Sequence, residues 1–157
     1  YATKHGSTGE VAAEIARVLE EGGAHVDLAR MRDVSGVEGY DLVVLGAPLY
    51  MGRLLREGRS FLRRHRGRLE AARLAIFALG PVGDEEGVED SARAQLERAL
   101  AKGPALEPVA VALFGGVIRP ERMRFPFSRM PAGDWRDWDE IRRFAASLAA
   151  RVPAHVA

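Results

Sequence analysis

The chain of 157 residues is long enough for one domain with a sizeable core, and its 47% hydrophobic and 29% charged residues are typical of a soluble globular protein. Its 23 Lys and Arg against 22 Asp and Glu give a net charge of +1, which offers no support for a nucleic-acid partner. The absence of cysteine excludes disulfides, thiolate catalysis and cysteine-ligated metal centres, and no apolar run is long enough to cross a bilayer. With no secretory signal visible, we expect a single cytoplasmic domain over residues 1–157.

The chain opens with a stretch rich in Gly, Ser and Thr that runs directly into an amphipathic helix over residues 8–21. Thr8 is the predicted N-cap, one face repeats apolar residues, and Gly22-Gly23 end the helix. A loop of this kind gathers backbone N–H groups and hydroxyls at a helix N-terminus, where the helix dipole favours an anion. We therefore predict that residues 3–8 bind a phosphate group.

Apolar strands and helices alternate along the rest of the chain. The predicted strands are 25–29, 41–46, 74–79 and 109–114, and the predicted helices are 53–66, 88–101 and a last one from Trp138 to Val152. This alternation predicts a doubly wound α/β fold, a parallel sheet with helices on both faces. A strand should also precede the phosphate loop, but only Tyr1 and Ala2 are present, so we expect further apolar residues upstream of Tyr1.

Three loops that contain glycine are expected at the carboxyl ends of the strands, where open α/β sheets bind their ligands. The first is Thr3–Thr8, the second runs from Gly46 to Arg53, and the third from Gly80 to Asp84. The stretch 117–135 lacks regular pattern and carries four Arg and two Phe, which is typical of a functional loop that contacts something flat or anionic.

A family resemblance follows from the first segment. It resembles the flavodoxin signature, because the family's spacing is kept by Tyr1, Thr3, Gly6, Thr8, Ala12 and Ile15. It matches neither the Walker A motif nor the dinucleotide fingerprint. The resemblance extends over the whole chain. Within the family it is similar to the menaquinone-dependent protoporphyrinogen oxidases of heme biosynthesis and their uncharacterised relatives, in segments 47–52, 61–65, 114–119 and 137–138.

The resemblance implies a five-stranded parallel sheet in the order 2-1-3-4-5, with the first strand truncated, and FMN as the cofactor. The residues that would hold the 5′-phosphate are Thr3, Lys4, His5, Gly6, Ser7 and Thr8. One side of the isoalloxazine ring would be covered by Ala47, Pro48, Leu49, Tyr50, Met51 and Gly52, with Tyr50 stacked on the ring. The other edge would be lined by Gly80, Pro81, Val82, Gly83 and Asp84. We assign no metal site and no general base.

Charge distinguishes this chain from electron-carrier flavodoxins, which are typically strongly acidic. Lys4, His5, Arg53, Arg56 and Arg119 fall near the predicted loops, and positive charge there would favour a reduced, anionic flavin. Our hypothesis is an FMN oxidoreductase, similar to protoporphyrinogen oxidase, that passes electrons from an organic substrate to a quinone or another acceptor. The resembling enzymes carry a longer, helical, basic insertion where this chain has a short stretch broken by proline, 120–133.

Two alternatives stay open. One is a one-electron flavodoxin carrier whose partner is a redox protein, and the other is a flavin-free module that regulates or binds a partner. Peripheral membrane contact is open as well, and the sequence predicts no oligomeric state.

Overall fold

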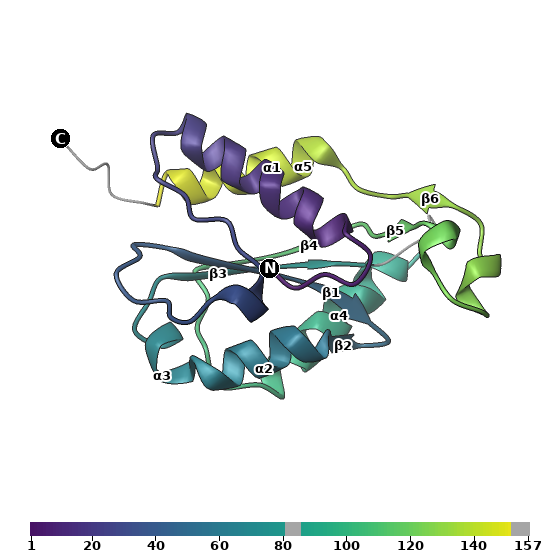
Figure 1. Cartoon of the computed structure of the whole chain (residues 1–157), viewed down its shortest axis with the longest axis horizontal. Helices are drawn as coiled ribbons and strands as arrows, with labels where there is room; N and C mark the ends of the chain where they lie inside the picture. Colours follow the sequence, from purple (N-terminus) through teal and green to yellow (C-terminus); the bar gives the residue numbers. More distant parts are fainter. Residues whose placement is uncertain (81–85, 152–157) are drawn as a thin grey trace.

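The structure, a computed structural model, describes residues 1–80 and 86–151. It is a three-layer α/β arrangement in which helices cover both faces of a sheet (Figure 1). Within the described residues, three parallel strands are neighbours in the order β1–β3–β4, and β2 pairs antiparallel with β1. The bounds are β1 Val43–Tyr50, β2 Arg53–Leu54, β3 Leu74–Leu79 and β4 Ala110–Phe114.

The helices divide between the two faces of the sheet, as Figure 1 shows. On one face lie α1 (Ser7–Glu21) and α5 (Trp138–Ala149), which pack against each other. On the other lie α2 (Arg56–Arg64) and α4 (Val88–Ala101), and the short α3 (Arg66–Leu69) follows α2. The predicted alternation of helices and strands, and with it the α/β fold class, is confirmed. None of the helices in residues 1–80 and 86–151 has the length and apolar character of a membrane-crossing segment.

Strand β3 forms the centre of the core, because every residue in it is buried. Its side chains alternate between the cluster under α2 and α4 and the cluster under α1 and α5. Phe77 belongs to the second cluster and lies opposite Gly46 of β1, where a Cβ on Gly46 would overlap the aromatic ring. We expected Gly46 at a strand end with room for a ligand; instead it lies inside β1, and its missing side chain makes room for Phe77.

The prediction of a strand at 25–29 is wrong, because the structure has no strand there. The strands in the described residues therefore do not reproduce the predicted order 2-1-3-4-5. Residues 24–30 run without strand assignment. Tyr1 contacts the end of this segment: its amino group donates to the Ala29 carbonyl at 2.8 Å, and its carbonyl accepts from Met31 N–H at 2.9 Å. Ala2 N–H donates to the Gly46 carbonyl of β1 at 2.8 Å. Residues 24–28 lie along a groove of about 440 Å³ under α1, and no strand in residues 1–80 and 86–151 pairs with them. A 3₁₀ turn, η1 (Met31–Asp33), follows.

The second predicted loop is mostly a β-hairpin. Strand β1 continues to Tyr50, so Ala47–Tyr50 are strand residues, and Arg53–Leu54 return as β2 instead of beginning a helix. Met51 and Gly52 form the connecting turn with φ of 47° and 71°. Two central residues with positive φ are typical of the type I′ turn, whose twist matches that of the flanking strands.

The predicted irregular stretch 117–135 has more structure than expected. Strands β5 (Val117–Ile118) and β6 (Gly133–Asp134) pair antiparallel and enclose two 3₁₀ turns, η2 (Pro120–Arg122) and η3 (Phe127–Arg129). We call residues 117–136 the lobe. Trp135 fixes its base, because Cβ atoms on Gly115 and Gly133 would overlap the Trp135 backbone and ring. Figure 1 shows the lobe beside the N-terminal end of α1.

Candidate functional site

The loop ahead of α1 is held in one conformation by its own hydrogen bonds. Thr3 Oγ1 accepts a hydrogen bond from Gly6 N–H at 2.9 Å, and the Gly6 carbonyl accepts from Gly9 N–H at 2.9 Å. Gly6 has a φ of 98°, and it, not the predicted Thr8, is the N-cap of α1. Residues with a Cβ rarely adopt the left-handed conformation found at Gly6. This conformation directs the backbone into α1.

Thr8 lies in the first turn of α1 and is 1% exposed. Its Oγ1 has no hydrogen-bond partner in the described residues. An unpaired buried hydroxyl costs about 1–3 kcal/mol, so a structure that keeps one usually uses it for a ligand or a water. Together with the unpaired N–H groups that every helix N-terminus presents, this hydroxyl fits an anionic group such as a phosphate.

The first loop, the hairpin and Gly80, the one described residue of the third loop, lie close together. Lys4 Nζ lies 5.9 Å from the centroid of the Tyr50 ring, which joins the first loop to the hairpin. A Cβ on Gly80 would lie 3.1 Å from the Leu49 carbonyl oxygen, which joins the third loop to the hairpin. Tyr50 is 43% exposed, and partial burial raises the pKa of its phenol. The side chain of Met51 at the tip of the hairpin is exposed. Of the third loop, Pro81, Val82, Gly83 and Asp84 lie outside the described residues.

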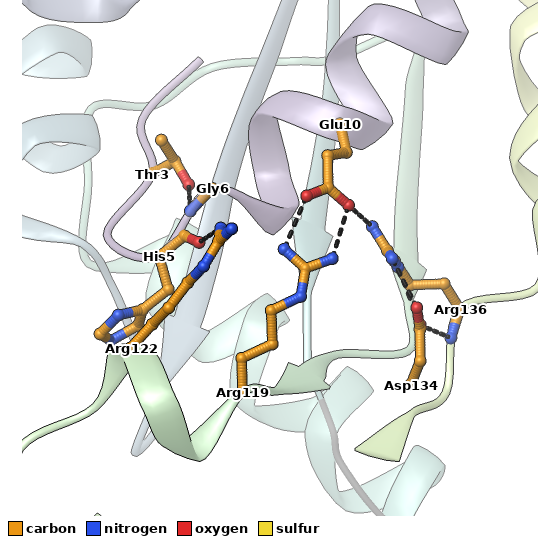
Figure 2. A network of polar contacts seen from close by, with 8 residues as sticks. All are labelled: Thr3, His5, Gly6, Glu10, Arg119, Arg122, Asp134 and Arg136. Atoms are coloured by element: carbon orange, nitrogen blue, oxygen red, sulfur yellow. Dashed lines mark hydrogen bonds and ion pairs between the residues drawn. The ribbon is translucent and has the colours of Figure 1, made fainter. Parts of the chain in front are cut away.

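The lobe contributes three arginines, of which sequence reasoning placed only Arg119 near the site. Figure 2 shows Arg119 and Arg122 extending from the lobe toward α1 and the phosphate loop. Arg119 donates two hydrogen bonds to the Glu10 carboxylate, at 2.6 and 2.9 Å, and Arg122 donates one to the His5 carbonyl at 3.1 Å. Arg136 donates to Glu10 at 2.7 Å and to Asp134 at 2.8 Å. The sequence offered one signal, the four arginines within residues 117–135. Their number does not predict which arginine contacts which partner.

These ion pairs alter the electrostatics around the loop. Hydrogen bonds from Arg119, then those from Arg136, lower the pKa of Glu10 from 4.5 to about 2. Arg119 was expected as a free positive charge near the ring, and its charge is instead paired with Glu10. Burial, followed by the nearby Lys4 charge, lowers the pKa of His5, so His5 is mainly neutral at pH 7. No group of three acidic or histidine side chains that could bind a metal occurs in the described part of the chain.

The Glu10 network predicts a pH-dependent stability difference. The folded carboxyl has the lower pKa, so its contribution is full above pH 4.5 and is lost as pH falls toward about 2. Because the Glu10 side chain is 41% exposed, we expect this contribution to be only about 1 kcal/mol. Urea unfolding of the wild type and Glu10→Gln between pH 7 and pH 2 measures it, with Glu20→Gln on the same helix as control. A stability difference that stays constant to pH 2 would contradict the assignment.

Comparison with known proteins identifies the family. The profile of the flavodoxin domain matches residues 1–130. The chain belongs to the flavodoxin-domain family. Membership implies an FMN-binding fold, with which the buried Thr8 hydroxyl and the glycine-turned loop at the start of α1 agree.

Similar solved structures and a similar protein of known name support the assignment to the flavodoxin-domain family. The fold is similar to two-electron reduced flavodoxin from Megasphaera elsdenii, with a TM-score of 0.56, 20% identity and coverage of 94% of this chain and 96% of that one. It is also similar to oxidised flavodoxin 1 from Bacillus cereus, with a TM-score of 0.54, 17% identity and coverage of 99% and 95%. Protoporphyrinogen IX dehydrogenase (quinone) of Escherichia coli (strain K12) is 24% identical over 166 residues, which cover 95% of this chain and 92% of that protein. The flavodoxin-like fold is thus confirmed.

Proposed function

We propose that this flavodoxin-domain protein is an FMN-dependent oxidoreductase of the protoporphyrinogen dehydrogenase type. In this proposal it passes electrons from an organic substrate, first among them a porphyrinogen, to a quinone or another acceptor. The observation that carries the cofactor is the buried Thr8 hydroxyl at the start of α1, which has no hydrogen-bond partner in residues 1–80 and 86–151. The name and nearly full-length match of the Escherichia coli relative support the substrate and the acceptor.

The phosphate loop would bind the cofactor's phosphate. Thr8 would donate its hydroxyl hydrogen, while the free N–H groups of the first turn would donate theirs along the helix dipole. Thr3 Oγ1 accepts the Gly6 N–H and so shapes the loop, and its own hydroxyl hydrogen would remain free to donate to the phosphate. His5 and Ser7 are half-buried, and Lys4 is exposed beside Tyr50.

The hairpin would cover one side of the flavin ring. When bound, FMN supplies the acceptance and release of electrons, singly or in pairs. Tyr50 would present its ring to the flavin, and the type I′ turn at Met51–Gly52 would fix its position from the end of β1. Lys4 beside Tyr50 would add positive charge there, which favours a negatively charged reduced cofactor. The role of residues 81–84 at the other edge stays a prediction.

Two measurements test the proposal. Titration of the purified protein with FMN, followed by flavin fluorescence, should show stoichiometric binding, with riboflavin bound more weakly because it lacks the phosphate. The FMN-loaded protein should then oxidise protoporphyrinogen IX in the presence of a menaquinone analogue, faster than free FMN does. Tyr40→Ala serves as control for Tyr50→Ala, because Tyr40 is similarly exposed but hydrogen-bonded to Asp27 instead. Only Tyr50→Ala should weaken binding of both flavins.

The electron-carrier alternative is supported by the likeness to the two flavodoxins over almost the whole chain. It predicts FMN binding without porphyrinogen turnover, together with rapid electron exchange with a redox protein. A chain that binds no FMN would contradict both redox functions and leave the flavin-free module.

A further inference from the structure

The guanidinium groups beside the phosphate loop differ in their partners. Arg119 and Arg136 form ion pairs with the carboxylates of Glu10 and Asp134, so these four side chains together carry no net charge. Arg122 has no such partner: within residues 1–80 and 86–151 its one hydrogen bond goes to the neutral carbonyl of His5, and it makes no ion pair there. A surplus positive charge therefore stands next to the loop.

The position of Arg122 is set by the backbone of the loop. Its guanidinium lies against Gly6, where a Cβ would come within 3.2 Å of Nη1. A guanidinium carries five N–H donors in a planar fork, and within the described residues Arg122 uses one of them, on the His5 carbonyl. Figure 2 shows this group beside Gly6 and the Thr3 side chain, at the turn where the chain enters α1. Unused donors at this point are available to an anion bound by the loop.

The lobe holds Arg122 in place through contacts that do not involve the ligand. Arg119, three residues before Arg122, is clamped to Glu10 in the first turns of α1 by two hydrogen bonds. Arg136 at the other end of the lobe contacts the same carboxylate, and its side chain is 4% exposed. The lobe is therefore attached to the very helix whose N-terminus faces the ligand.

We propose that Arg122 is a phosphate-binding residue of this protein, supplied by the lobe to complete the anion site of the first loop. A bound monoester phosphate carries about −1.5 to −2 charges, which Arg122 and Lys4 together would balance. The inference rests on the proposed binding of FMN and extends it to a residue outside the first loop.

The test compares two flavins that differ only in the phosphate. Arg122→Gln should raise the Kd of FMN about tenfold and leave the Kd of riboflavin unchanged, as expected for loss of one charge-assisted hydrogen bond. Arg122→Lys should recover part of the loss, because it restores the charge without the fork. The matched control is Arg129→Gln on the same lobe, whose guanidinium lies over the Phe125 ring at 5.1 Å and which should bind FMN like the wild type.

The possible results distinguish a failure of the role assigned to Arg122 from a failure of FMN binding itself. If the wild type binds FMN and Arg122→Gln binds it equally well, or loses FMN and riboflavin to the same extent, the role of Arg122 is overturned while FMN binding stands. If the wild type itself binds no FMN, the proposed function fails and the inference fails with it. A weaker dependence of FMN affinity on salt in Arg122→Gln would support the assigned charge.

Discussion

Replacing Gly46 by alanine is expected to lower the free energy of unfolding by about 3 kcal/mol, the upper end of the usual cost of overpacking a core. Gly46 sits opposite Phe77 in the parallel ladder of β1 and β3, and the space of its missing Cβ is filled by the Phe77 ring. Phe77 is 1% exposed and also contacts Phe114, so the ring has little room to move. Urea denaturation of the flavin-free protein measures the change.

Two further variants make this prediction specific. Gly67→Ala in α3 is the control, because a Cβ there meets nothing within 4 Å, and its stability should stay within about 0.5 kcal/mol of the wild type. Phe77→Leu should remove most of the clash, so that Gly46→Ala costs clearly less in that background than in the wild type. If Gly46→Ala lowers the free energy of unfolding equally in both backgrounds, the Phe77 ring is not the reason why alanine is unfavourable at position 46.

Thr8→Val is expected to change stability and cofactor affinity in opposite directions. Valine has nearly the shape of threonine but removes a buried hydroxyl that has no partner in the described residues, so the flavin-free protein should gain about 1 kcal/mol. If the hydroxyl donates to the FMN phosphate, the Kd of FMN should rise about 10- to 100-fold, because hydrogen bonds to charged groups contribute about 1.5–3 kcal/mol. Riboflavin should bind unchanged.

Thr8→Ser is the matched control for this experiment. It keeps the hydroxyl and removes only a methyl group, so it should bind FMN much more tightly than Thr8→Val does. Thermal unfolding with and without FMN, together with fluorescence titration, provides both readouts. A valine variant that is less stable without flavin and unchanged in FMN affinity would show that the hydroxyl has a partner within the protein instead.

Regular periodicity explains which elements could be predicted from the sequence. The ranges 74–79 and 88–101 coincide with β3 and α4. The first is a short apolar run closed by Gly80-Pro81, which favours a strand, and the second has apolar residues at helical spacing. The start of α1 was placed within a residue, yet its cap was misassigned. A threonine is a common N-cap, and the sequence does not reveal that Gly6 adopts a positive φ and takes that position.

Contacts between distant segments explain what was missed. The glycines of residues 46–53 suggested a loop, but β1 continues to Tyr50. The strand β2 returns along it after a two-residue turn that lacks the usual Asn-Gly. The predicted strand 25–29 had the right pattern, but it pairs with no strand in the part of the chain that the structure describes. The lobe consists of two-residue strands and single turns, whose stability comes from Trp135 and Glu10 rather than from their own sequence.

The bond between Glu10 and Arg119 spans 109 residues of chain, and that between His5 and Arg122 spans 117. Contacts of such sequence separation form late in folding, because the entropy of closing a long loop must be overcome first. Because Arg119 and Arg122 lie more than 100 residues after the opening segment that they contact, we expect them to reach it late in folding. Cofactor capture should accordingly report on completed folding, and partly folded chains should compete poorly for FMN.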